Sequence, residues 1–244
     1  MKRRLIRIGI SAMLAVGVAL PITAQPASAA VDPLTVIKVI QQIYSVYKGF
    51  TSGGGGGPTL QQAIQQITTA IQSAQNAITS QIDLVAAADV KACADSAVVN
   101  FADINALSSD NLQAFALATT ACVTQANSLL NVVTDKSAAD QLGFAMNTVG
   151  PLALMARIKA GLTTPGLTSV LVAGENTLIT ALLPACHQED LNGGEPGTPH
   201  VLVWDCFAYN GNEGVAKKRA TSENSATSNT SRAVAQNELP VLTT

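Results

Sequence analysis

The chain has 244 residues, with 14 lysines and arginines against 16 aspartates and glutamates, so its formal net charge is −2. Only 12% of the residues are charged, and the basic footprint typical of DNA- and RNA-binding proteins is missing. We therefore expect no nucleic-acid partner, while the length is sufficient for a domain with a sizeable core.

The first 29 residues have the three parts of a secretory signal peptide. A basic stretch, MKRRLIR, precedes the apolar run IGISAMLAVGVALPI and then AQPASA, whose small residues favour cleavage after Ala29. The pair Arg3-Arg4 also occurs in twin-arginine signals, but the residues after it match that signal poorly, so we expect Sec-type secretion. Cleavage leaves 10 basic and 16 acidic side chains, a net charge of −6. No later run of about 18 apolar residues predicts a membrane span.

Residues 30–50 predict an N-terminal amphipathic helix. Its apolar residues recur at spacings of three and four, from Leu34 through Ile40 to Tyr47. The glycines of TSGGGGGPT have too much conformational freedom to continue a helix, and no strand or P-loop lysine accompanies them. Residues 51–58 are therefore expected to be a Gly-rich linker.

The most regular pattern in the chain begins at Thr59. Apolar residues step by four and three from Leu60 to Ile78, the heptad spacing of a coiled-coil helix, and a weaker pattern continues to about residue 104. A turn follows at 104–111 and another helical pattern at 110–133. These segments predict a long antiparallel helical hairpin over 59–133.

Four cysteines in an exported chain favour two disulfides, although three pairings are formally possible. No two cysteines have the close spacing of a structural zinc site. Cys93 and Cys122 are equidistant from the expected turn at 107–108, and Cys186 and Cys206 are equidistant from Pro196 in a Gly/Pro-rich turn. The pairing 93–122 with 186–206 is therefore favoured.

The most apolar part of the exported chain is the region 141–184. Helical patterns here are separated at Gly150-Pro151 and at TTPG, and we expect core helices on either side of each break. The alternative is a membrane-interacting hairpin of the kind that helical pore-forming toxins insert. Arg157, Lys159 and Glu175 interrupt the apolar runs, and charges in mid-bilayer are costly.

Both histidines and the one tryptophan lie between Cys186 and Tyr209. The run HVLVWDCFAY is strand-like, which predicts a small disulfide-closed loop or β-hairpin near the C-terminus. His187, His200, Trp204 and Asp205 form the candidate binding surface. Two histidines and a carboxylate could ligate a metal or act in catalysis, but their spacing matches no recurrent motif.

We therefore expect an all-α fold: an elongated bundle around the long hairpin, in a disulfide-stabilised helical domain at 59–210. The polar residues 211–244 predict a disordered tail. The chain lacks the GxSxG, HExxH, P-loop and GxGxxG motifs of common enzyme classes, so we expect no cofactor and no catalytic residue.

Three functions remain open from the residues alone. The first is a secreted, non-enzymatic bacterial protein with a protein or cell-envelope partner. The second is a membrane-active, pore-forming-toxin-like protein that acts at a membrane surface. The third is a metal-dependent or hydrolytic enzyme that uses His187 and His200.

Overall fold

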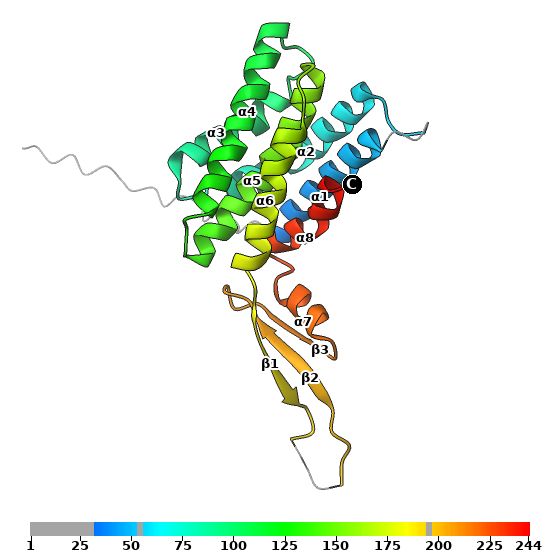
Figure 1. The fold of residues 1–244 in the computed structure, drawn as a ribbon, viewed down its shortest axis with the longest axis vertical. Helices are drawn as coiled ribbons and strands as arrows, with labels where there is room; N and C mark the ends of the chain where they lie inside the picture. Colours follow the sequence, from blue (N-terminus) through cyan, green and yellow to red (C-terminus); the bar gives the residue numbers. More distant parts are fainter. Residues whose placement is uncertain (1–31, 53–55, 194–196) are drawn as a thin grey trace, which may run out of the picture. The chain divides into compact units, whose positions relative to one another are not determined.

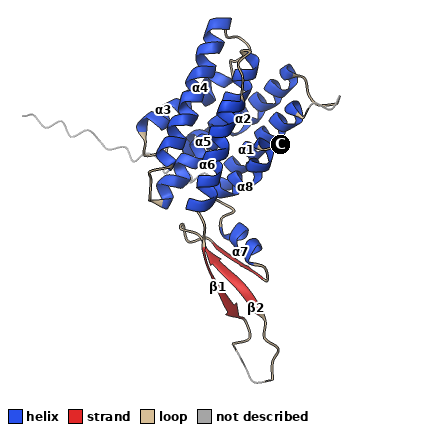
Figure 2. Ribbon diagram, in the orientation of Figure 1, coloured by secondary structure: helices blue, strands red, loops and turns tan. Residues whose placement is uncertain are grey.

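The computed structural model describes residues 32–52, 56–193 and 197–244. Their elements are α1 (Pro33–Thr51), α2 (Leu60–Ile82), α3 (Ala88–Phe101), α4 (Ser109–Leu130), α5 (Lys136–Lys159), α6 (Pro165–Ala181), β1 (Ala185–Asp190), β2 (Leu202–Phe207), β3 (Glu213–Ala216), α7 (Arg219–Ala226) and α8 (Ser231–Leu242). This part of the chain is mostly helical with one small antiparallel sheet (Figures 1 and 2). The expected signal peptide at 1–29 lies outside the described residues, as does part of the expected linker.

The first two helices begin where the sequence supplies caps. Asp32 accepts a hydrogen bond from the backbone N–H of Leu34, and Thr59 and Gln62 form a reciprocal capping box at the start of α2. The two helices pack on each other. The apolar stripe of α2, from Ile64 to Ile78, is buried as its period indicates.

Helix α5 lies at the centre of the helical part and contacts α1, α2, α3, α4, α6 and α8. Every residue of α5 from Leu142 to Ala156 is buried. The expected break at Gly150-Pro151 is wrong, because α5 continues through Pro151. A proline inside a helix removes one backbone hydrogen bond, and the packing of α5 on six neighbouring helices offsets that loss.

The long antiparallel hairpin expected over 59–133 is not confirmed. Helix α2 ends at Ile82, and the chain turns before α3 begins at Ala88, while Val85 in this turn is buried. Helix α2 packs mainly on α1, and α4 packs mainly on α5. The apolar pattern of the sequence runs on through this turn, because a buried turn residue such as Val85 is apolar like the buried residues of a helix. The pattern therefore does not reveal where α2 ends. The Cys93–Cys122 disulfide is confirmed and joins α3 to α4.

The C-terminal residues 211–244 are not a disordered tail, as their composition had suggested. They form β3, α7 and α8, and α8 packs on α1, α5 and α6. Buried polar residues of this segment have specific hydrogen bonds, such as that from the Arg232 side chain to the carbonyl oxygen of Ile179, at 3.1 Å. Burial of this kind leaves no apolar period in the sequence, so the pattern could not indicate it.

The second disulfide, Cys186–Cys206, is also confirmed and joins β1 to β2. The small element expected here is a β-hairpin, to which β3 adds a third strand. Within the described ranges, no helix combines the length and the hydropathy needed to cross a membrane.

Candidate functional site

The sheet that carries the candidate residues has the strand order β1-β2-β3, and both pairs of strands are antiparallel. Cys186 is opposite Cys206, and in the next row His187 is opposite Asp205, which is opposite Val215 on β3. Residues paired across antiparallel strands lie on the same face of the sheet, and neighbours along a strand lie on opposite faces. The two faces therefore carry different chemistry.

One face is covered by α7. Gly214 lies against this helix so closely that a Cβ atom there would be 2.3 Å from the carbonyl oxygen of Ser222. The Ser222 hydroxyl donates a hydrogen bond of 2.8 Å to the carbonyl oxygen of Trp204, and the Arg219 guanidinium lies 5.2 Å from the centroid of the Trp204 ring. Trp204 thus belongs to the contact with α7, on the face that also holds the disulfide.

The opposite face, here called the open face, carries His187, Glu189, Val203, Asp205, Phe207, Glu213 and Val215. His187, Glu189 and Asp205 each offer one ligand atom, and these atoms lie within 4.8 Å of one another. The Nε2 atom of His187 is 3.9 Å from Oδ2 of Asp205, too far for a hydrogen bond. The His187 ring stacks on Phe207, with ring centroids 6.0 Å apart.

Asp205 is the unusual member of this group. It lies on the central strand, flanked by His187 and Val215, and is only 6% exposed. Its Oδ1 atom has no hydrogen-bond partner in the part of the chain that the structure describes. Burying a carboxylate oxygen without a partner is costly.

The second histidine, His200, has a different environment at the far end of the β1–β2 hairpin. Its Nδ1 atom contacts Oδ2 of Asp190, while Oδ1 of Asp190 accepts hydrogen bonds from the backbone N–H groups of Asn192 and Val201. The hydrogen bond with His200 lowers the pKa of Asp190. His200 and Asp190 together close the hairpin end.

The structure therefore divides the candidate surface. It brings His187 and Asp205 together, turns Trp204 to the other face and pairs His200 with Asp190. Glu189 was missing from the candidates. The alternation of His187 and Glu189 along a strand would have indicated it, but the residues before the turn, ACHQED, lack the valines and aromatics that mark β2 as a strand.

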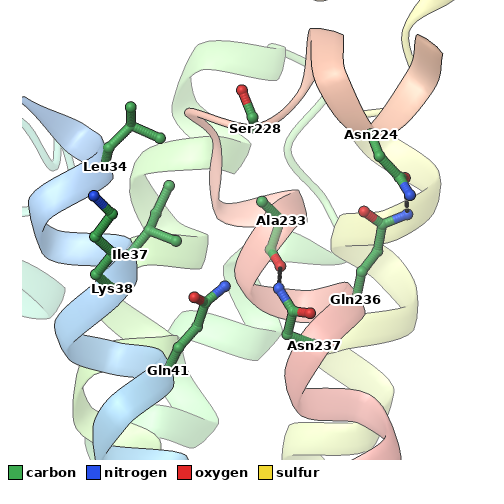
Figure 3. A pocket seen from close by; sticks show the side chains of 9 residues that line it. All are labelled: Leu34, Ile37, Lys38, Gln41, Asn224, Ser228, Ala233, Gln236 and Asn237. Atoms are coloured by element: carbon green, nitrogen blue, oxygen red, sulfur yellow. Dashed lines mark hydrogen bonds between the residues drawn. The ribbon is translucent and has the colours of Figure 1, made fainter. Parts of the chain in front are cut away.

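A separate pocket of about 500 Å³ lies between α1 and the C-terminal helices α7 and α8 (Figure 3). Lys38 and Gln41 line it from α1, and Asn224, Gln236 and Asn237 line it from the opposite side. The Gln236 amide is hydrogen-bonded to Asn224, and that of Asn237 donates to the carbonyl oxygen of Ala233. Polar and apolar side chains line the pocket in similar measure, and its amides already have hydrogen-bond partners within the protein.

Two carboxyl groups are buried inside the helical part. Burial raises the pKa of Glu175 on α6 to about 8 and that of Glu238 on α8 to about 9. The charge of Glu175 contributes to the shift at Glu238. Both groups therefore hold a proton at neutral pH, the form that a low-dielectric interior tolerates.

Comparison of the chain with protein-family models, with curated proteins and with solved structures found no match in any of the three.

Proposed function

We propose that this chain is a secreted, non-enzymatic protein that binds an extracellular or cell-envelope partner through the open face of its sheet. The observation that carries the proposal is the difference between the two faces. α7 covers one of them, whereas Phe207 and Val215 on the open face are 39% and 49% exposed. Aromatic side chains such as phenylalanine are enriched at protein interfaces, and exposed apolar patches mark interaction sites.

The scaffold under this face is rigid. The Cys186–Cys206 disulfide fixes the register of β1 and β2, and α7 packs against β2 and β3 from behind. A surface that is already ordered loses less conformational entropy when a partner binds. Glu189 and Glu213, at the two flanks of the face, add carboxylates that favour basic or hydroxyl-bearing groups on the partner.

Secretion is the second part of the proposal. It is supported by the expected signal peptide and by the two disulfides, which persist in oxidising compartments.

The test is binding of fluorescently labelled protein to isolated cell envelopes and to the extracellular matrix material of the producing organism. The double variant F207S/V215S should bind at least about tenfold more weakly, because it removes both apolar anchors. The matched control V99S/L117S changes two side chains of α3 and α4 that are 51% and 57% exposed, and it should bind like the wild type.

Circular dichroism and mass-spectrometric mapping of the disulfides establish that both variants are folded. Equal binding by the two double variants would reject the open face as the interface. Absence of saturable binding by the wild type to any of these materials would reject the function itself.

The alternative function, membrane activity, is tested with the same protein. In the structure the region 141–184 forms α5 and α6 inside the helical part, with Asn147, Thr148 and Glu175 buried among the apolar residues. Insertion would carry these polar groups into lipid. Leakage of a dye from liposomes at micromolar protein would favour this alternative over the proposed function.

A further inference from the structure

We propose that His187, Glu189 and Asp205 form a binding site for a divalent transition-metal ion, with Zn²⁺ as the ion that fits best. The site does not depend on the identity of the partner that the open face binds. It is also distinct from a centre made of both histidines, because His200 is paired with Asp190 at the hairpin end.

Strand geometry brings the three groups together. His187 and Asp205 are directly opposite each other on β1 and β2, and Glu189 is two residues beyond His187, on the same face of β1. The disulfide in the adjacent row, Cys186–Cys206, prevents the slip in register that would separate them. The three ligands thus come from a fixed backbone.

The distances are those of a site that closes around an ion by small side-chain rotations. Two ligands bound to one tetrahedral zinc ion at about 2.1 Å lie about 3.4 Å apart. Nε2 of His187 and Oδ2 of Asp205 are 3.9 Å apart, so they need to approach each other by only about half an ångström. All three ligand atoms lie within 4.8 Å of one another, and His187 and Glu189 are exposed.

Asp205 supplies a second and independent observation. Its side chain is 8% exposed, and its Oδ1 atom has no hydrogen-bond partner among the described residues. No lysine or arginine in the described ranges forms an ion pair with it. An ion pair with His187 at 3.9 Å leaves Oδ1 unsatisfied, whereas a dication coordinated by the carboxylate compensates its charge directly.

The type of ligand selects the type of metal. One imidazole nitrogen and two carboxylate oxygens suit zinc and its neighbours in the transition series. Calcium and magnesium prefer a full set of oxygen ligands. Three protein ligands on an open sheet leave at least one coordination position to water.

The experiment is isothermal titration of the protein, prepared without a histidine tag and stripped with a chelator, with ZnCl₂. We expect one ion per chain, and the variants H187A and D205N should weaken binding at least about tenfold because each removes a ligand. The variant H200A is the matched control, since it removes the other exposed histidine of the same hairpin and should leave the affinity unchanged. MgCl₂ and CaCl₂ should give no comparable heat.

A second measurement separates ligand loss from misfolding. Four- or five-coordinate Co²⁺ absorbs visible light much more strongly than aqueous Co²⁺, and this stronger absorption should appear with the wild type and H200A but not with H187A. Disulfide mapping of each variant checks that the hairpin is intact. The site is rejected if the stoichiometry stays well below one, or if H187A binds zinc as tightly as H200A. Either result leaves binding of a partner to Phe207 and Val215 untouched.

Discussion

At the scale of single residues, the buried acids Glu175 and Glu238 make the fold sensitive to pH. Both have pKa values raised from 4.5, to about 8 and about 9, chiefly because burial disfavours the charged form. The folded chain therefore holds these protons more tightly than the unfolded chain does. Their contribution to stability is fully present below about pH 4.5 and is lost as the pH rises through 8 to 9.

We predict that the free energy of unfolding falls between pH 5 and pH 9, by up to about 1.4 kcal/mol per pH unit for each of the two groups. E175Q keeps a neutral side chain at every pH, so it should reduce this slope by roughly half. Urea denaturation at several pH values measures the slope of the free energy of unfolding against pH. E213Q, which changes an exposed acid on β3, is the control, and a slope equally reduced in E213Q would contradict the assignment.

At the scale of elements, α5 depends on small residues where other helices approach it. Gly143 faces α8 and α6, and a Cβ atom there would lie 2.4 Å from Oγ of Ser231 and 2.6 Å from a methyl carbon of Leu178. Gly150 is similarly close to Leu171 and to the Tyr44 hydroxyl. These glycines let α5 be surrounded on all sides, which explains a helix without an apolar stripe.

We predict that G143A destabilises the protein by about 1–3 kcal/mol, because the added methyl group forces the buried side chains of Ser231 and Leu178 to move. The matched control is G166A in α6, where a Cβ atom would meet nothing within 4 Å. Alanine has the higher helix propensity, so G166A should be neutral or stabilising by up to about 1 kcal/mol. Thermal unfolding of both variants measures the difference in stability. Equal melting temperatures would show that the neighbours of Gly143 accommodate a methyl group without loss of stability.

At the scale of the whole molecule, local signals in the sequence predicted most of the helices, both disulfides and the terminal hairpin. They did not predict which helices pack together. The heptad stripe of α2 can pack on α1 as well as on the second arm of the hairpin expected over 59–133, and the sequence does not distinguish the two. For the site, spacing placed His187 and Asp205 in one candidate surface. Spacing could not assign Trp204 to the other face, because the face depends on the register of the strands. It also could not predict that the polar residues 211–244 are folded, because their burial depends on hydrogen-bond partners far away in the sequence.

Asp140 of α5 is the clearest of these distant partners. Its Oδ1 atom accepts a hydrogen bond of 2.6 Å from the backbone N–H of Ser231 at the start of α8, and its Oδ2 atom accepts one of 2.7 Å from the hydroxyl of Tyr209, just after β2. One buried carboxylate thus connects the central helix to the sheet and to the last helix. Removing it leaves the buried backbone N–H of Ser231 without a partner, while the Tyr209 hydroxyl, on a residue that is 37% exposed, can bond to water instead.

We predict that D140A lowers the free energy of unfolding by about 1–3 kcal/mol, the cost of one buried donor left unsatisfied, here the Ser231 N–H. Hydrogen–deuterium exchange should accelerate first in 207–216 and 231–242 and remain slow in 60–82, because neither bond involves a residue of α2. Y209F should affect the 207–216 segment alone, and D103A, an exposed aspartate before α4, should have little effect. Uniformly faster exchange along the whole chain of D140A would mean that Asp140 supports the core in general. Faster exchange confined to 207–216 and 231–242 would establish that this carboxylate holds the sheet and α8 to the other helices.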